Sequence, residues 1–232
     1  MRIVSLVPSW SEWLYDLGKE PIGVTKFCVH PKGMNKRATQ IGGTKNIHVN
    51  KINALKPDLV IASKEENVKE QVDALDAPVM VTDVCSVADA WMAMQDIADA
   101  AGKSTSGADW IDRIQEAWGV PRESKVSASY VIWKSPWMVA GGGTYINDVL
   151  QWWGIENAHR HRQRYPQVHA EELAQIVLLS SEPFPFGPQH LNELDLIERR
   201  AMLVNGEACS WYGSRMWHAM DDLKHLANRL DG

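Results

Sequence analysis

The first sixty residues most constrain the fold, because they alternate apolar strands with a helix. Residues 3–7 form a short apolar run, which predicts a buried strand. The Ser-Trp-Ser-Glu segment 9–12 fits a capping box and predicts a helix that ends at Gly18. Residues 21–24 and 59–62 predict two further strands. Strand, helix and strand in this order make a βαβ unit, and ligands bind at the carboxyl ends of the strands in such sheets.

The second half of the chain repeats this plan. Residues 129–133 and 137–140 have the composition of strands, and a run of three glycines follows them. Thr144 then has the character of a helix N-cap, and the helix predicted over 145–153 ends at Gly154. The repeat predicts two α/β lobes of similar plan.

The segment between the two halves is helical in pattern. Apolar residues recur at spacings of three and four over 86–118, and a last amphipathic helix is predicted from about 214 to 230. The expected fold is therefore α/β, with two similar lobes joined by a helical linker and a ligand cleft between the lobes. The expected boundaries are 1–85 for the first lobe, 86–121 for the linker and 122–232 for the second lobe.

Composition excludes several classes of protein. The chain has 232 residues, of which 45% are hydrophobic, so it can bury a sizeable core. Its formal net charge of −5 gives no global attraction to nucleic acid, and it has no apolar segment long enough to cross a bilayer. Cys28, Cys85 and Cys209 predict no disulfide framework and favour a reducing compartment. Without a leader after Met1, the expected location is the cytosol, or the periplasm if a signal peptide was removed.

Four motifs in the first lobe carry a family resemblance. They are Ser-Leu-Val-Pro-Ser-Trp-Ser-Glu at 5–12, Pro-Ile-Gly-Val at 21–24, Ile-Gly-Gly-Thr at 41–44 and Ala-Leu-Lys-Pro-Asp-Leu-Val-Ile at 54–61. In this order and spacing the chain resembles the periplasmic-binding-protein family that captures vitamin B12, haem and ferric siderophores for ABC importers. The resemblance implies a monomeric substrate-binding protein with an ABC permease as partner and no intrinsic cofactor.

Loops at the predicted strand ends supply aromatic faces, cations and hydroxyl groups. This mixture suits a large, flat, partly anionic ligand, although core packing is the alternative for each aromatic side chain. The expected ligand-binding residues are Trp10, Ser11, Lys26, Phe27, Lys45, Trp137, Thr144, Tyr145, Phe184, Trp211, Tyr212 and Arg215.

Signals for metal binding and catalysis are weak. Cys28 and His30 lie two residues apart and are the best candidates for metal ligands, although a buried thiol beside a surface imidazole explains them better. His159 and His161 lie in an arginine-rich loop that would repel a cation. No catalytic motif is present, and no nucleophile is predicted beside a base.

The expected function is therefore non-catalytic binding of a metal chelate, either a corrinoid, haem or a ferric siderophore. The resemblance also implies that acidic residues dock the protein to its permease, and the candidates are Glu65, Glu66, Glu70, Glu182 and Glu193. The alternative is a cytosolic enzyme that acts on a small anionic metabolite held by Lys26, Lys45 and Arg215.

Overall fold

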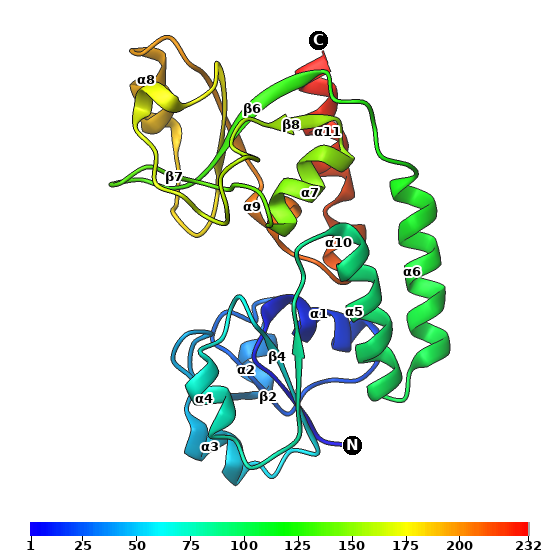
Figure 1. Cartoon of the computed structure of the whole chain (residues 1–232). Helices are drawn as coiled ribbons and strands as arrows, with labels where there is room; N and C mark the ends of the chain where they lie inside the picture. The colour runs from blue at the N-terminus through cyan, green and yellow to red at the C-terminus, as the bar shows by residue number, and fades with distance from the viewer. Residues whose placement is uncertain (232) are drawn as a thin grey trace. The chain divides into compact units, whose positions relative to one another are not determined.

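The computed structural model describes residues 1–231 and consists of two compact units (Figure 1). Unit 1 comprises Met1–Val84, Ala88–Ala117 and Tyr212–Arg215. Unit 2 comprises Cys85–Val87, Trp118–Trp211 and the chain from Met216 onward. The chain thus returns to unit 1 for four residues near its C-terminal end, which the sequence did not predict.

Unit 1 is built on a parallel five-stranded sheet in the order β3-β2-β1-β4-β5. Because all its strands run the same way, the loops after their carboxyl ends gather at one edge. Its elements are β1 (Ile3–Ser5), α1 (Pro8–Asp16), β2 (Gly23–Val24), α2 (Met34–Arg37), β3 (Thr39–Gln40), α3 (Val49–Ala54), β4 (Leu59–Ser63), α4 (Lys69–Asp73), β5 (Val79–Thr82), α5 (Val87–Ala100) and α6 (Ser104–Trp118).

The core of unit 1 joins the sheet to its helices. A buried apolar cluster combines Val4 and Val60 of the central strands with Ile52 of α3 and Val72 of α4. Elsewhere the indole of Trp13 on α1 donates a hydrogen bond of 3.1 Å to the carbonyl oxygen of Met94 on α5. The sequence alternates apolar strands with amphipathic helices. In the folded unit these elements pack together as layers of sheet and helix around a shared core.

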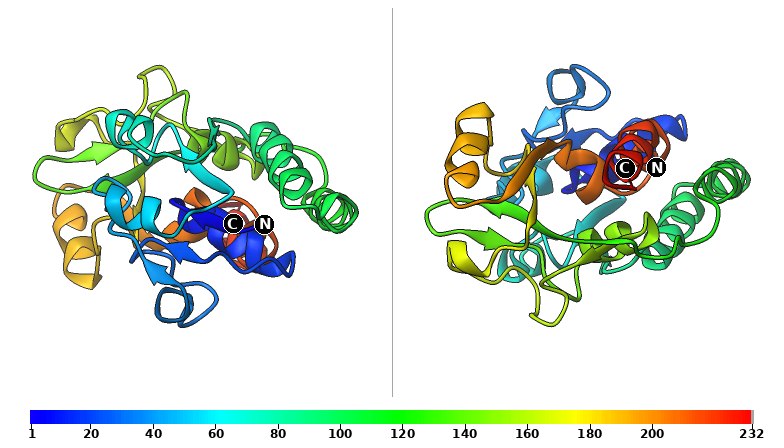
Figure 2. Two further views of the ribbon diagram at one scale, coloured as in Figure 1. Left: turned by 90° about the horizontal axis from the view of Figure 1, so that it is seen from below. Right: turned by 90° about the horizontal axis from the view of Figure 1, so that it is seen from above.

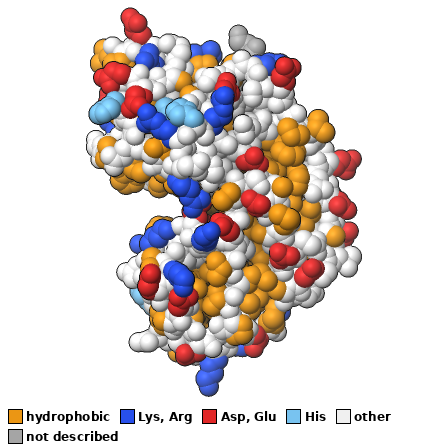
Figure 3. Space-filling model, in the orientation of Figure 1, with side chains coloured by type: hydrophobic (Ala, Val, Ile, Leu, Met, Phe, Trp, Pro, Cys, Tyr) orange, Lys and Arg blue, Asp and Glu red, His pale blue; other side chains and the backbone are white. Residues whose placement is uncertain are grey.

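Helices α5 and α6 fill the segment that was expected to link the lobes. Figures 1 and 2 show them running side by side. Gly107 allows this close packing, because a Cβ atom there would lie 2.4 Å from the Cβ of Ala98. Almost all of both helices packs as part of unit 1. On the face seen in Figure 3, hydrophobic side chains gather over β5 and α5, elements whose exposed side chains include Val81 and Met92.

Unit 2 is built on a separate mixed sheet in the order β10-β9-β6-β7, with β8 also paired to β6. Only the β6–β7 pair is antiparallel among the strand pairs of its described residues. Its elements are β6 (Val126–Trp133), β7 (Met138–Val139), α7 (Tyr145–Trp152), β8 (Ile155–Asn157), a 3₁₀ turn (Ala170–Glu172), β9 (Ile176–Ser180), α8 (Pro188–Asp195), β10 (Arg200–Val204), α9 (Gly206–Ser210), α10 (Arg215–His218, whose first residue packs with unit 1) and α11 (Met220–Asp231). Two separate sheets confirm the predicted pair of α/β lobes.

The helix signals of the sequence are confirmed in part. Thr144 caps α7, since its side-chain oxygen accepts a hydrogen bond from the backbone N–H of Asn147. The capping box at Ser9 is wrong, because α1 begins at Pro8 and its N-cap is Val7. The single last helix is also wrong, since α10 and α11 divide it. No helix within residues 1–231 combines the length and apolarity that crossing a membrane requires.

Candidate ligand-binding site

A pocket of about 540 Å³ lies at the carboxyl edge of the unit 1 sheet, where β2 and β3 end. We call it the basic groove. It is lined by Lys26, Phe27, Gln40, Gly42, Gly43, Thr44, Lys45, Asn46, His48 and Lys51. Three of these ten residues are lysines, and none of the described residues that line it is acidic. The groove brings together three of the predicted ligand-binding residues: Lys26, Phe27 and Lys45.

The glycine pair of the Ile-Gly-Gly-Thr motif shapes one wall of the basic groove. Gly42 has a φ of +106°, and a Cβ atom there would lie 2.4 Å from the carbonyl oxygen of Asn46. The N–H of Gly43 donates to the same carbonyl oxygen at 2.9 Å, which closes a tight turn. The Gly42 carbonyl oxygen accepts a bond of 2.9 Å from the N–H of Lys26. The turn therefore fixes the β2 loop against the β3 loop.

The buried amide of Asn67 holds the β3 loop from the other side. Its Nδ2 donates to the carbonyl oxygens of Thr44 at 3.0 Å and Leu6 at 3.4 Å. Its Oδ1 accepts a bond of 2.8 Å from the N–H of Ser63. Three strand-end loops thus meet at one side chain. No local pattern predicted this role, because two of the three bonds join Asn67 to loops that are distant in the chain.

The exposed chemistry of the basic groove is one aromatic face flanked by cations. Phe27 is 49% exposed, and the ammonium group of Lys26 lies 4.9 Å from the centroid of its ring. The ammonium group of Lys45 donates to the carbonyl oxygen of Glu65. Such a surface offers stacking and charge-assisted hydrogen bonds to a flat anion.

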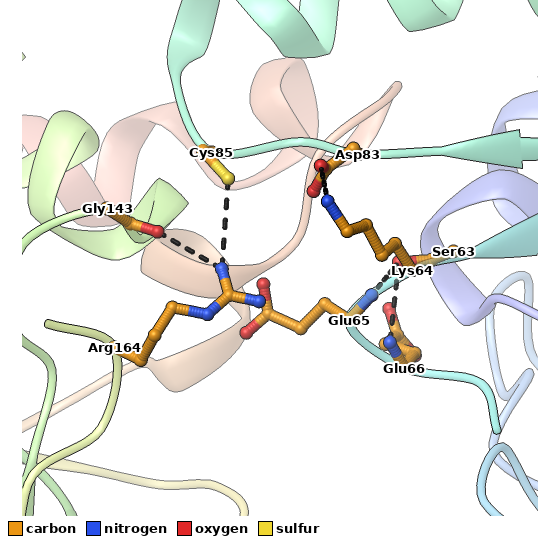
Figure 4. Close-up of polar contacts among 8 residues, drawn as sticks. All are labelled: Ser63, Lys64, Glu65, Glu66, Asp83, Cys85, Gly143 and Arg164. Atoms are coloured by element: carbon orange, nitrogen blue, oxygen red, sulfur yellow. Dashed lines mark hydrogen bonds and ion pairs between the residues drawn. The ribbon is translucent and has the colours of Figure 1, made fainter. Parts of the chain in front are cut away.

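The loop after β4 is ordered by its own polar contacts (Figure 4). The hydroxyl oxygen of Ser63 accepts bonds from the backbone N–H groups of Glu65 at 3.2 Å and Glu66 at 3.4 Å. The ammonium group of Lys64 lies 2.7 Å from the carboxylate of Asp83. These contacts position the backbone that carries two of the acids expected to dock a permease.

Trp10 and Ser11 were expected to reach the ligand, and the structure corrects this. The Trp10 side chain has no exposed surface, and its indole donates a bond of 2.9 Å to the hydroxyl of Thr82. The Ser11 hydroxyl is also buried and donates to the carbonyl oxygen of Val7 at 3.0 Å. Core packing, the alternative weighed for the aromatic residues, explains Trp10.

Tyr212 and Arg215 are corrected for the same reason. The Tyr212 ring is buried 4.4 Å from the ring of Trp10, and burial raises the pKa of its hydroxyl well above the ordinary value. The guanidinium of Arg215 donates to the carboxylate of Glu12 at 3.0 and 2.5 Å. Only 13% of the Arg215 side chain and 7% of the Glu12 side chain are exposed. Arg215, which was expected to hold an anionic ligand, is instead paired with the carboxylate of Glu12.

For Cys28, the structure favours the buried thiol, which was the preferred explanation over metal binding. Its thiol is fully buried and hydrogen-bonded with the hydroxyls of Ser11 at 3.0 Å and Thr25 at 3.3 Å. Burial raises the pKa of the Cys28 thiol, which disfavours the thiolate that binds metals. His30 lies two residues further along the chain and is half-buried.

In unit 2, Thr144 and Tyr145 are also buried, which corrects their assignment to the ligand. The Thr144 hydroxyl donates to the carbonyl oxygen of Gly141 at 2.7 Å and caps α7. The N–H groups of Gly141 and Gly142 donate to backbone carbonyl oxygens of an arginine-rich loop. Arg164 of that loop donates to the carbonyl oxygen of Gly143 and lies 3.8 Å from the sulfur of Cys85 (Figure 4).

Aromatic side chains of unit 2 form a cluster of their own. Trp137 lies parallel to Phe186 with ring centroids 6.2 Å apart, and Phe184 lies 4.6 Å from Phe186. Trp133 joins the cluster at 5.4 Å from Phe184 and is 40% exposed. Trp133 was expected only as a strand residue. Its place at the very end of β6, beyond the run of buried residues, was the available signal.

Trp211 and the acids of unit 2 make contacts within that unit. The indole of Trp211 donates to the carboxylate of Glu182 at 2.7 Å, and the Ser210 hydroxyl donates to the same oxygen at 2.9 Å. The ammonium group of Lys134 forms an ion pair with Glu193 on α8. In unit 1, Glu70 is exposed on α4.

The fold is α/β with two sheets, and the basic groove at the edge of the first sheet is a candidate binding site. The chain belongs to the periplasmic binding protein family, whose sequence profile matches residues 3–177. An uncharacterised ABC transporter substrate-binding lipoprotein of Bacillus subtilis (strain 168) is 26% identical over 192 residues, which cover 75% of this chain and 60% of the relative. The chain therefore spans less than two thirds of that relative.

Other relatives and structures agree with this family. A vitamin B12-binding protein of Salmonella choleraesuis (strain SC-B67) is 25% identical over 188 residues, covering 74% of this chain and 68% of the relative. A periplasmic haem-binding protein of Vibrio cholerae superposes with a TM-score of 0.80 at 17% identity, over 99% of this chain and 98% of the other. A periplasmic vitamin B12-binding protein of the same species gives 0.75 at 16%, over 99% and 96%. At these identities the structures show the shared fold.

Proposed function

We propose that this protein is the substrate-binding component of an ABC importer and holds a metal chelate without transforming it. The observation that carries the proposal is the basic groove, found at the carboxyl edge of a parallel sheet in a member of the periplasmic binding protein family. Relatives named for vitamin B12, haem and ABC transport support the ligand class and the transporter.

Different groove residues offer the ligand different kinds of interaction. Phe27 offers its exposed ring to a flat chelate, and stacking of this kind contributes roughly 0.5–1.5 kcal/mol beyond the burial of area. Lys26 and Lys45 supply ammonium donors to acidic groups of the chelate. The fixed turn at Gly42 keeps these groups in place before the ligand arrives, which reduces the entropy that binding loses.

The permease partner belongs to the same proposal. Glu65, Glu66 and Glu70 in unit 1 and Glu182 and Glu193 in unit 2 are the acids that we propose for docking. Exposure favours Glu70 on α4 as the first contact, whereas Glu193 on α8 is exposed but already paired with Lys134. Glu182 acts less directly, because its carboxylate already accepts bonds from Trp211 and Ser210.

Ligand titration tests the proposal. Haemin, cyanocobalamin and a ferric catecholate are each added to the purified chain, and binding is followed by tryptophan fluorescence and the visible spectrum. We expect at least one chelate to bind, and the Phe27→Ala variant to bind it about 2- to 13-fold more weakly.

The matched control is Met92→Ala, which removes an exposed apolar side chain of α5 outside the groove. It should bind as tightly as the parent. Failure of all three chelates to bind, or equal affinity of the Phe27→Ala variant, contradicts the proposal.

A further inference from the structure

The basic groove differs in charge from the rest of the chain. The whole protein has 24 lysines and arginines against 29 acids, whereas the groove lining has three lysines and no acid among its described residues. Like charges in the groove repel one another and attract water and counter-ions. Binding is favourable when an anionic ligand takes the place of these counter-ions. The positive charge of the groove therefore affects which ligands bind there, according to their own charge.

Two of the three lysines are the best placed to bind charge on a ligand. Lys26 follows β2 and Lys51 lies on α3, so they approach the groove from different elements, and both side chains are exposed. The ammonium group of Lys45 already donates one hydrogen bond to the carbonyl oxygen of Glu65. Arg215, the third cation expected from the sequence to bind an anion, is neutralised by Glu12.

We infer that the basic groove selects chelates that carry at least two negatively charged groups, with Lys26 and Lys51 as the residues that determine this specificity. This inference rests on the proposed function and narrows its ligand class. A neutral corrinoid or hydroxamate chelate gives neither ammonium group an anionic partner. A porphyrin with two carboxylates or a catecholate chelate gives each lysine a partner.

The size of the effect follows from the exposure of the site. Two unit charges 4 Å apart gain about 1 kcal/mol in water, which corresponds to about a fivefold change in affinity. Two lysines acting on two acidic groups therefore give a preference of about 10- to 30-fold for the anionic ligand. The preference should shrink as salt screens the charges.

The experiment compares ligands that share a shape and differ in charge. Haemin is paired with its dimethyl ester, and a ferric catecholate is paired with a neutral ferric trihydroxamate. Dissociation constants are measured for the parent protein and for Lys26→Gln, Lys51→Gln and the control Lys69→Gln, whose ammonium group lies outside the groove on α4.

We expect the anionic member of a pair to bind at least about tenfold more tightly to the parent. Lys26→Gln and Lys51→Gln should each weaken the anionic ligands about fivefold and leave the neutral ones unchanged, while Lys69→Gln changes neither. Equal binding of charged and neutral ligands overturns the inference and leaves the proposed function standing. Equal weakening of both ligands by the lysine variants does the same. If no chelate of either charge binds, the proposed function itself fails.

Discussion

The ion pair between Glu12 and Arg215 is a contact between side chains that are both nearly buried. Replacing Arg215 by Ala leaves a carboxylate in the interior without its cation. Such a change costs about 3–5 kcal/mol of unfolding free energy. Urea unfolding followed by circular dichroism measures the loss.

The exposed pair of Lys69 and Asp73 on α4 provides the control for that experiment. Removing a partner of this exposed pair should change the free energy of unfolding little, because water screens the two charges. The Arg215→Ala variant should therefore unfold at a clearly lower urea concentration than Lys69→Ala. Similar midpoints for the two variants would contradict the buried role of Arg215.

His159 gives unit 2 a pH-dependent stability. Its Nε2 lies 2.8 Å from the buried hydroxyl of Ser129, and burial lowers the pKa of the ring, helped by the charges of Arg162 and His161. The unfolded ring binds its proton near pH 6.5, and the folded ring binds it only at lower pH. The contribution of His159 to stability is therefore complete above about pH 6.5 and is lost as the pH falls through the folded pKa.

Thermal melting at pH 7.5 and pH 5.0 tests this prediction. The parent should lose more melting temperature between the two values than His159→Gln, which cannot titrate. His225→Gln is the control, because the His225 side chain is exposed on α11 and is not among the charges that shift the His159 ring. Equal losses in the parent and His159→Gln would show that His159 does not carry the effect.

At the scale of elements, the turn at Gly42 makes the groove depend on one backbone position. Gly42→Ala adds a Cβ atom that would lie 2.4 Å from a carbonyl oxygen, in a residue with positive φ. Gly33 also has a positive φ, but a Cβ atom there would meet nothing within 4 Å. Comparing Gly42→Ala with Gly33→Ala therefore separates the cost of backbone strain from the cost of steric overlap.

We expect Gly42→Ala to be destabilised by about 1–3 kcal/mol more than Gly33→Ala, because overpacking adds to strain. Gly42→Ala should also bind the chelate more weakly, since the turn carries Thr44 and Lys45. Urea midpoints and ligand titration measure the two effects. Equal stability of the two variants would mean that the turn at Gly42 accommodates the added Cβ atom without loss of stability.

Local patterns predicted the elements well where the interaction itself was local. Thr144 caps α7 through an N–H three residues away, and Gly18 follows α1 with a positive φ of 68°. The capping box at Ser9 failed because Pro8 is already helical, and its acid, Glu12, pairs with a residue 203 positions away. A contact at that separation leaves no trace in a local pattern.

The candidate site, like the helices and strands, was predictable only where a local pattern placed its residues. Lys26 and Phe27 follow the predicted strand 21–24, whereas Lys45 follows β3, a two-residue strand that was not predicted. Lys51 was missed because it lies on a helix, where a lysine is ordinarily a solvated surface residue. Trp10 and Tyr212 were misjudged because sequence position at a strand end does not reveal whether a second segment covers the side chain.

At the scale of the whole molecule, unit 1 is assembled from three separate stretches of chain. The shortest, Tyr212–Arg215, covers Trp10 and pairs with Glu12 on α1. We expect Tyr212→Ala to speed hydrogen exchange of the α1 amides, because the helix loses a buried aromatic neighbour. Mass spectrometry of peptides from 8–17 measures this change.

Lys224→Ala on α11 is the control for that measurement, since it alters unit 2 alone. It should leave exchange in α1 unchanged. If Tyr212→Ala speeds exchange only near residue 212, the segment does not support α1.

This discontinuous assembly sets an order of events during protein synthesis. Nearly all of unit 1 has been synthesised when residue 117 is added, but Arg215 is added about 100 residues later. At 5–20 residues per second, the nascent chain spends roughly 5–20 s with Trp10 uncovered and Glu12 without its cation. A ribosome that stalls or stops within this interval releases a first unit with an open apolar face, which makes such a product a ready substrate for chaperones and proteases.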